Sequence, residues 1–533
     1  MKNLLNKILL LAFLSANTGV FSQNTIGLLY SDINTTEGYT LFTPEKNTSV
    51  YLINNCGEVV NEWTFSENPG ISCYLLDNGN LLRAGKDSLQ IRDWNNSVVW
   101  TYAMNDNGLL QHHDIEPLPN GNILCVITDR YTAAEAIAVG RDPNNVATNF
   151  KLDKIVELQP VGIDNANIVW EWKFIDHFVQ DFDNTKPNFG VVINSPELID
   201  INYDNGYDND YTHVNGIDYN SSLDQIIIST RHLSEIHIID HSTTLAEAAG
   251  NSGGNSGMGG DIIWRWGNPA VYDQGTITDQ KLFKQHDAKW VQDGYLDDGK
   301  ISVFNNEGTS ASTYSSIHLI EPEIINGIYT KDTGKFKPLN FDWSWNGTIM
   351  GDLVYENKKS GVQSLSNGNM LICESFTGRV SEINKNGDHL WTYIVPHGQS
   401  FLSQFSTPTN NGIFRAEKYP SNFIGFVGND LTPQGIIENQ NDSSDACILI
   451  TDVQEKITLQ SKIGIYPNPT SNEFTIQSNS KIESITIIDL TGKKIKKEIK
   501  NKNSISVNEL SSGIYFIEIL TLEGKFIEKF IKE

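Results

Sequence analysis

The chain has 533 residues, more than one ordinary globular core holds, so we expect several domains or a repeat architecture. Its composition is that of a soluble folded protein, and its formal net charge of -26 would repel nucleic acid and anionic membranes, which excludes both as expected partners. An anionic substrate would therefore need local positive donors such as buried arginine and histidine.

Residues 1–22 have the features of a signal peptide. Lys2 and Lys7 give a basic start, Ile8–Leu14 is a short apolar run, and Ser22 offers a small residue at the cleavage point. The apolar run is too short to span a membrane as a helix, and no later segment is long enough. A buried N-terminal helix is the alternative, but it does not account for the order of these features. We expect an exported chain that does not span the membrane.

Two short patterns recur in the following part of the chain. In the first, Asn-Gly-Asn leads into an apolar run. Since Asn-Gly forms the two-residue turn of a β-hairpin, each copy predicts a strand, a turn and a strand. In the second, aromatic residues alternate with polar ones, which places the rings on one face of a strand. The first pattern begins at Leu76, Leu118 and Leu365, and the second occupies residues 62–65, 100–102, 170–172, 264–266, 343–345 and 391–393.

Six aromatic segments at irregular spacing predict a six-bladed β-propeller, which we assign to residues 23–455. The tryptophan rings are then expected to pack between neighbouring blades rather than to form a binding platform. A two-sheet β-sandwich is the alternative, but it needs fewer residues and would not repeat the aromatic segment six times.

The five cysteines contain no CxxC pair, so we expect no zinc site. Cys125 and Cys373 lie in apolar segments and are expected in the core. Cys56 and Cys73 could form a bridge in an oxidising compartment, which the sequence leaves open.

Residues 456–533 differ in kind from the rest. Tyr466-Pro467-Asn468-Pro469 precedes short alternating strands, and Ser512-Gly513-Ile514-Tyr515-Phe516 precedes the last pair, which predicts a small β-sandwich. These motifs and the basic end resemble the C-terminal sorting domain of the type IX secretion system. The resemblance implies contact with the type IX secretion machinery and export across the outer membrane to the cell surface or the medium. A carbohydrate-binding or adhesive module is the alternative.

Histidines open or close three strand-like segments of the propeller region. The segments are His112-His113-Asp114, Thr212-His213-Val214-Asn215 and Gln285-His286-Asp287-Ala288, and Arg231-His232 follows the second. Together with Phe304-Asn305-Asn306, and in this order over residues 75–400, they resemble the arylsulfate sulfotransferase family. The resemblance implies a six-bladed propeller that moves a sulfuryl group from a phenolic sulfate ester to a phenolic acceptor, with no nucleotide sulfate donor, no metal and no other cofactor.

The residue types suit that chemistry. Neutral His286 can offer an unprotonated ring nitrogen and form a transient sulfohistidine, provided that a neighbour fixes its tautomer. Arg231 suits the non-bridging sulfate oxygens. His213 and Asn215 are two residues apart, so on a strand they are expected to face one side and donate to the ester or leaving oxygen. His113 is expected to act as a further donor or as an acid and base.

The predicted site therefore combines these side chains with His112, and the sequence does not decide which of His112 and His113 faces the pocket. Any one of these histidines alone is typical of a hydrogen-bonded residue at a strand end; the ordered set favours a site. The predicted catalytic residues are His286, His213, Arg231, His113 and Asn215, and the predicted substrate contacts are His112, Arg231 and Asn215.

Three other functions stay open at this point. If water is the acceptor, the protein is a hydrolase. If the active-site motifs are degenerate, it is a non-catalytic surface propeller that binds glycan or protein. A quinone-dependent dehydrogenase is a third, but no calcium ligands or cofactor cavity are recognisable. Only about fifty residues separate the signal peptide from the first Asn-Gly-Asn repeat. Better-known members of the family carry a subunit-pairing domain there, so we expect a monomer.

Overall fold

The computed structural model describes residues 24–146, 148–207, 209–309, 313–438, 463–478, 481–489, 493–499, 504–521 and 524–533. The predicted signal peptide, residues 1–22, lies outside the described residues. Among the residues described, no helix has both the length and the apolar character needed to cross a membrane.

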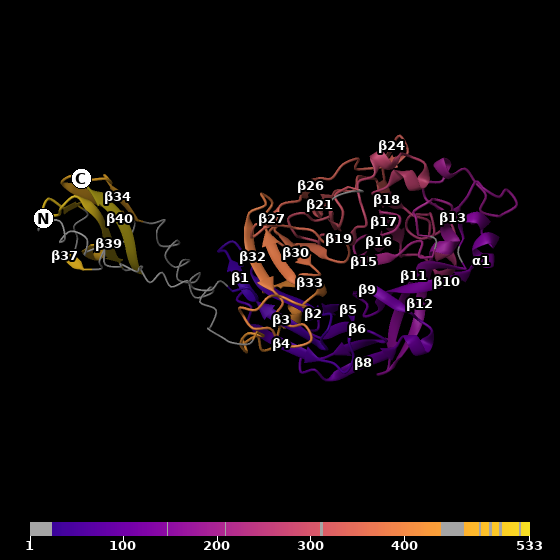
Figure 1. Cartoon of the computed structure of the whole chain (residues 1–533), viewed down its shortest axis with the longest axis horizontal. Helices are drawn as coiled ribbons and strands as arrows, with labels where there is room; N and C mark the ends of the chain where they lie inside the picture. Colours follow the sequence, from indigo (N-terminus) through magenta and orange to yellow (C-terminus); the bar gives the residue numbers. More distant parts are fainter. Residues whose placement is uncertain are drawn as a thin grey trace, which may run out of the picture.

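Six antiparallel sheets of four or five strands form a ring and confirm the six-bladed β-propeller (Figure 1). From the innermost strand outward, the blades are β33 (Ile413–Pro420), β2 (Gly38–Pro44), β3 (Ser49–Asn54), β4 (Val59–Thr64); β5 (Pro69–Leu75), β6 (Leu81–Gly85), β7 (Ser88–Arg92), β8 (Val98–Ala103); β9 (Gln111–Pro117), β10 (Ile123–Thr132), β11 (Asn149–Val161), β12 (Asn165–Lys173); β15 (Val214–Asn220), β16 (Gln225–Thr230), β17 (Glu235–Asp240), β18 (Trp264–Trp266); β19 (His286–Trp290), β20 (Ile301–Asn305), β21 (Ser316–Ile320), β26 (Trp343–Trp345); and β29 (Gly361–Ser364), β30 (Met370–Glu374), β31 (Arg379–Ile383), β32 (His389–Ile394), β1 (Gly27–Ser31).

Insertions between the blade strands carry short elements of their own. Thr132 caps α1 in a capping box, and Thr244 does the same for α2. These elements are α1 (Ala133–Ala138), β13 (Phe178–Val179), β14 (Ile199–Asp200), α2 (Leu245–Ala248), β22 (Ile324–Ile325), β23 (Ile328–Tyr329), β24 (Lys331–Asp332), β25 (Lys335–Phe336), β27 (Thr348–Ile349) and β28 (Asp352–Leu353).

The ring closes at two places where strands from opposite ends of the propeller pair. β33, the last propeller strand in the sequence, pairs with β2 and becomes the innermost strand of the first blade. β1, the first strand, pairs with β32 at the outer edge of the last blade. Closure of this kind leaves only short blade edges exposed.

Tryptophans of the outer strands confirm the expected packing between neighbouring blades. One indole Nε1–H in each blade donates to a backbone carbonyl of the next blade, and the sixth bond returns to the first blade. The six donor–acceptor pairs are Trp63–Asp93 at 2.9 Å, Trp100–Asn165 at 2.9 Å, Trp172–Gly260 at 2.6 Å, Trp264–Lys337 at 2.9 Å, Trp343–Lys385 at 3.0 Å and Trp391–Asn55 at 2.8 Å.

The Asn-Gly-Asn segments form hairpins, but the predicted two-residue turn is wrong. In the first copy, the N–H of Leu76 donates to the carbonyl of Asn80 and the N–H of Gly79 donates to that of Leu76, both at 2.8 Å. Three residues therefore lie between the paired positions. Only Gly79, with φ of 81°, is left-handed, whereas a two-residue type I′ turn needs positive φ at both central residues. The copies at Leu118 and Leu365 have the same two bonds.

The cysteines are divided between the core and one disulfide. Cys125 and Cys373 are buried free thiols, as expected. Cys73 is also free, whereas Cys56 is disulfide-bonded, so the bridge considered between these two is not formed.

The C-terminal residues form the expected β-sandwich with a core of its own. One sheet contains β34 (Ile463–Tyr466), β35 (Glu473–Ser478) and β38 (Ser504–Ser506); the other contains β37 (Lys494–Ile499), β36 (Ile482–Asp489), β39 (Gly513–Thr521) and β40 (Gly524–Lys532). Side chains of both sheets, including Phe474, Ile487, Ile517 and Phe530, are buried together.

Candidate active site

The innermost strands β9, β15 and β19 begin at the same end of the propeller and are irregular there. Each shifts register against its partner strand at its first residues. A non-glycine residue with left-handed φ lies within or directly before each shift: His113 at 58°, His213 at 49° and Asp287 at 56°. Bulges re-aim side chains, and strained residues of this kind concentrate at functional sites.

These irregular strand starts bring three predicted histidines together. The rings of His113 and His213 meet edge to face, with centroids 4.9 Å apart. Burial lowers the pKa of His113 well below its ordinary value, and positive charge on His112, His213 and His286 lowers it further. His113, His213 and His286 therefore lie within electrostatic reach of one another.

His286 is buried, and both of its ring nitrogens are engaged. Nδ1 lies 2.7 Å from Oδ1 of Asn306 and 3.2 Å from the carbonyl oxygen of Lys284, so it faces two acceptors and carries the proton. Nε2 is then the unprotonated nitrogen, and it accepts the backbone N–H of Lys359 at 3.1 Å. Burial lowers the pKa of His286 well below its usual range, with the charge of Arg231 adding to this and the bond to Asn306 opposing it.

His213 is oriented by a carboxylate that the sequence analysis missed. Its Nδ1 lies 2.6 Å from Oδ2 of Asp210, whose other oxygen is 2.9 Å from Nζ of Lys151. Burial opposes ionisation of Asp210, but His213 and Lys151 outweigh it and lower its pKa. His232, which had no predicted role, stacks on Tyr207 with centroids 3.6 Å apart.

Three side chains also lie close enough together to be compared with a metal site: Asp210, His213 and His232. Their potential ligand atoms are within 4.8 Å of one another. Hydrogen bonds account for that closeness, because Nδ1 of His213 pairs with the Asp210 carboxylate and Nδ1 of His232 with the Asp210 carbonyl.

His112 and His113, between which the sequence did not decide, have separate surroundings. His113 faces His213, while Nε2 of His112 lies 2.8 Å from Oδ1 of Asp153. Nδ1 of His112 lies 2.7 Å from Nδ1 of His113. Both ring nitrogens of His112 are therefore engaged within the protein, and the predicted substrate contact of His112 stays a prediction.

Asn215 and Arg231 differ in the hydrogen bonds that their side chains make within the described protein. The buried Asn215 donates from Nδ2 to the carbonyl of Gln285 at 2.7 Å, and its Oδ1 has no partner among the described residues. The register shift at Asn215 breaks the simple alternation from which we expected His213 and Asn215 to share a face. In the described part of the chain, the Arg231 guanidinium has no hydrogen bond or ion pair, so it is available to an anion.

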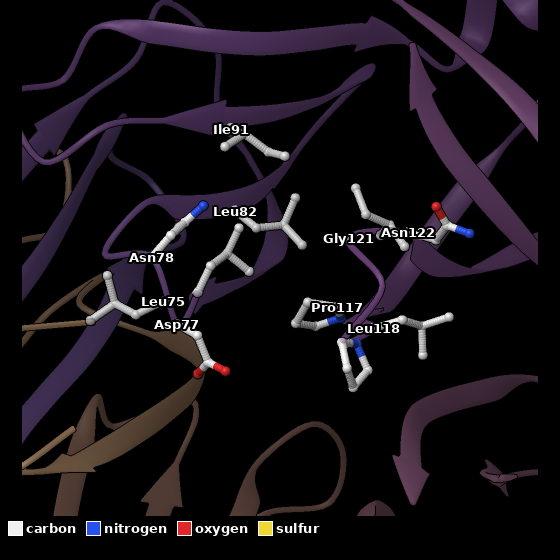
Figure 2. Close-up of a pocket in the computed structure, with 12 residues that line it drawn as sticks. Leu75, Asp77, Asn78, Leu82, Ile91, Pro117, Leu118, Gly121 and Asn122 are labelled. Atoms are coloured by element: carbon white, nitrogen blue, oxygen red, sulfur yellow. The ribbon is translucent and has the colours of Figure 1, made fainter. Parts of the chain in front are cut away.

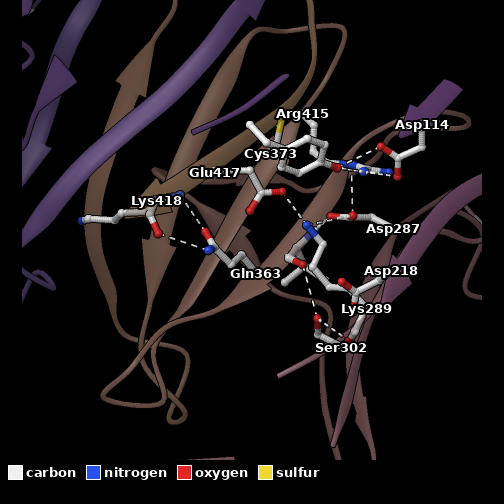
Figure 3. Close-up of polar contacts among 12 residues, drawn as sticks. Asp114, Asp218, Asp287, Lys289, Ser302, Gln363, Cys373, Arg415, Glu417 and Lys418 are labelled. Carbon is white, nitrogen blue, oxygen red and sulfur yellow. Dashed lines mark hydrogen bonds and ion pairs between the residues drawn. The ribbon is translucent and has the colours of Figure 1, made fainter. Parts of the chain in front are cut away.

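An ionic layer adjoins the histidine segments, because Asp114 follows His113 and Asp287 follows His286 in the sequence (Figure 3). Buried Arg415 bonds to Asp114 Oδ2, and its Nε lies 3.0 Å from Oδ1 of Asp287. Gly361 provides the room, since a Cβ there would overlap the Asp287 carboxylate. Arg415 thus ties the residue after His113 to the residue after His286.

Two cavities lie farther along the inner strands, away from the histidines. A cavity of about 370 Å³ is lined by Leu75, Leu82, Pro117 and Leu118 (Figure 2), and one of about 280 Å³ by Glu116, Asp218, Lys289 and Glu417. Pro117 is four residues beyond His113 on β9, which corresponds to about 13 Å. Neither cavity contains the histidine cluster.

Comparison with known families identifies the propeller. The description Arylsulfotransferase (ASST) matches residues 60–390, more than half of the chain. The chain belongs to the arylsulfotransferase family. It is therefore an arylsulfate sulfotransferase, as the histidine segments indicated. The secretion system C-terminal sorting domain matches residues 464–533 of this arylsulfotransferase, so it is exported to the cell surface or secreted.

Solved structures similar to this arylsulfotransferase are distant in sequence. A Bacteroides caccae protein of unknown function is 13% identical over 67% of this chain and 94% of its own, with a TM-score of 0.36. The Swd1 β-propeller domain of Myceliophteria thermophila is 9% identical over 70% and 90%, with a TM-score of 0.37. Virginiamycin B lyase of Staphylococcus aureus, solved with quinupristin, is 10% identical over 68% and 87%, with a TM-score of 0.32. None of the curated proteins compared with the chain matches it.

Proposed function

We propose that this arylsulfotransferase moves a sulfuryl group from a phenolic sulfate ester to a phenol by a ping-pong mechanism through a sulfohistidine at His286. No nucleotide sulfate donor takes part. The observation that carries the proposal is the tautomer of His286: Asn306 binds its Nδ1–H, so Nε2 presents a lone pair. The charge of Arg231, which has no partner among the described residues, is within electrostatic reach of His286.

The first half-reaction begins with the monoanionic ester bound by Arg231. The guanidinium donates to the non-bridging sulfate oxygens, for which its planar fork is suited. Nε2 of His286 attacks sulfur, the N–S bond forms, and the S–O bond to the phenolic oxygen breaks. His113 gives a proton to the leaving oxygen, and His213, held by Asp210, donates to the sulfuryl group.

The second half-reaction returns the enzyme to its starting state. An acceptor phenol gives its proton to His113 as its oxygen attacks sulfur. The S–O bond forms, the N–S bond breaks, and Nε2 of His286 recovers its lone pair. A new sulfate ester leaves, and no net proton is gained or lost over the two halves.

The backbone N–H of Lys359 has a defined place in this scheme. It occupies the Nε2 lone pair of the free enzyme at 3.1 Å. When sulfur takes that position, the same N–H faces the sulfuryl oxygens and can donate to one of them. Asn306 holds this segment, because its Nδ2 donates to the carbonyl oxygen of Lys359 at 2.8 Å.

Turnover of 4-nitrophenyl sulfate with and without phenol tests the proposal. Phenol-dependent release of nitrophenol, unchanged by a chelator, is the expected result. Phenol-independent release would indicate a hydrolase, and no release from the folded protein would favour the non-catalytic propeller that binds glycan or protein. His286→Asn keeps a buried polar side chain and is expected to abolish release.

The remaining proposals concern organisation and partners. The catalytic propeller spans residues 23–455 and acts as a monomer on small phenolic donors and acceptors. The C-terminal domain, residues 456–533, engages the type IX secretion machinery after removal of the signal peptide. The sorting-domain match over residues 464–533 supports this assignment.

A further inference from the structure

A chain of three side chains leads from the histidine cluster into the third blade. Asp153 on β11 is fully buried, and its Oδ1 lies 2.8 Å from Nε2 of His112. Nδ1 of His112 lies 2.7 Å from Nδ1 of His113, the histidine that faces His213. The order Asp153, His112, His113 therefore connects a buried carboxylate to the site.

Asp153 is an acceptor at both oxygens. Oδ2 receives the hydroxyl of Thr212 at 2.7 Å and the backbone N–H of Val214 at 2.6 Å. Burial opposes ionisation of Asp153, but its interaction with His112 and these hydrogen bonds outweigh it and lower its pKa. An ionised Asp153 requires a donor at Nε2 of His112, so that nitrogen keeps its proton.

The contact between the two Nδ1 atoms then allows two proton arrangements. A hydrogen bond of this kind holds one proton. If the proton belongs to His112, that ring is an imidazolium and neutral His113 carries its own proton on Nε2. If the proton belongs to His113, His112 is neutral and Nε2 of His113 is unprotonated. His113 is neutral in both arrangements. The first arrangement holds one proton and one positive charge more than the second, and its His113 offers a donor at Nε2 where the second offers an acceptor.

We propose that His112, held by Asp153, stores the proton that His113 exchanges with the phenolic oxygen. This inference rests on the proposed function. In the first half-reaction, His113 gives its Nε2 proton to the leaving oxygen while His112 passes its Nδ1 proton to Nδ1 of His113. The products are a phenol, a sulfohistidine and neutral His112. In the second, the acceptor phenol protonates Nε2 of His113, and the Nδ1 proton returns to His112.

The charges balance in each half. A monoanionic ester and an imidazolium His112 enter the first half, and a neutral phenol, neutral His112 and the sulfuryl adduct of neutral His286 leave it. His112 acts through His113 and is a positioning residue rather than a group that touches the substrate. The relay makes each proton available without exchange with bulk water.

The leaving-group dependence of the rate separates this role from a structural one. Phenyl sulfate needs a proton at its leaving oxygen far more than 4-nitrophenyl sulfate does, because 4-nitrophenolate is the more stable anion. In His112→Asn and Asp153→Asn, kcat for phenyl sulfate should fall about 100-fold more than kcat for 4-nitrophenyl sulfate, the lower end of what general acid catalysis contributes. Thr212→Val, which removes a different bond to Asp153, is the control and should affect the two donors alike.

Equal losses for both donors in the folded His112 and Asp153 variants would overturn the relay. Wild-type enzyme that transfers sulfuryl from neither donor would instead overturn the proposed function. If the variants do not fold, ¹⁵N-histidine NMR of the wild type is the test. Nδ1 of His112 should lose its proton when phenyl sulfate forms the sulfo-enzyme, and an unchanged His112 would contradict the inference.

Discussion

Oδ1 of Asn306 lies 2.7 Å from Nδ1 of His286, and this contact decides which ring nitrogen of His286 is protonated. Asn306 follows the last residue of β20, the strand that pairs with β19, on which His286 stands. Its Nδ2 donates to the carbonyl oxygens of Glu356 and Lys359, which fixes the amide orientation. The residue directly after the neighbouring strand of the same blade, Asn306, thus orients the proposed nucleophile, His286.

Replacing Asn306 should damage the reaction more than the fold of the site. Asn306→Ala removes the closer of the two acceptors at Nδ1 of His286, and kcat should fall by up to about 10⁴-fold, the loss seen when a triad histidine loses its orienting partner. Asn306→Asp keeps an acceptor at the same place and should recover part of the rate. Steady-state kinetics of both variants check this; equal activity of the alanine variant and wild type would refute the role.

Arg231 should be important for activity and unimportant for stability. Its guanidinium has no hydrogen bond or ion pair among the described residues, so Arg231→Met should change the free energy of unfolding by less than about 0.5 kcal/mol. The rate should fall about 100-fold or more, because one preorganised donor to the developing charge is lost. Urea unfolding and kinetics on the same preparation measure both, and a large stability loss would show that Arg231 is structural.

Arg415 should behave in the opposite way. It is buried between Asp114 and Asp287, so Arg415→Met leaves the buried Asp114 carboxylate without its cation and leaves Asp287 with Lys289 alone. We expect a loss of about 3–5 kcal/mol in the free energy of unfolding. The double variant in which Asp287 is also changed to Asn should lose less than the sum of the single variants. Strict additivity in urea unfolding would argue against the ionic layer.

The contribution of His286 and His113 to stability should fall as the pH falls below neutrality. Burial lowers the pKa values of His286 and His113 in the folded protein well below the unfolded value of about 6.5. Below about pH 6.5 the unfolded chain binds protons that the folded protein does not, so acid favours unfolding. His286→Asn should reduce the slope by up to about 1.4 kcal/mol per pH unit between pH 6.5 and 5.5. An unchanged slope in urea unfolding would contradict the assignment.

The repeating features of the fold could be predicted from the sequence because each blade repeats the same packing of an aromatic strand against the next blade. Trp63 and Trp391 lie on outer strands and bond across to the next blade, as the alternation of aromatic and polar residues indicated. The hairpin type could not be predicted from Asn-Gly alone. In each turn the left-handed conformation falls on a single glycine, such as Gly79, and this depends on the loop length.

The sequence indicated the members of the proposed site but not the contacts between them. His286, His213 and Arg231 stand in motifs, whereas Asp153 and Asp210 come from a distant strand and an insertion and carry no local signal. Strand alternation failed at Asn215 because the register shift there is a tertiary feature of β15. The Phe304-Asn305-Asn306 segment was the one available sign of an orienting residue for His286.

The most direct test is to trap the intermediate. The enzyme is incubated with 4-nitrophenyl sulfate without an acceptor, quenched at alkaline pH, digested, and searched by mass spectrometry for a peptide carrying one added SO₃ group. The SO₃ group is expected on His286; added phenol should remove it, and His286→Asn should not form it. An SO₃ group on another residue, or phenol-dependent transfer that persists in His286→Asn, would contradict a sulfohistidine at His286.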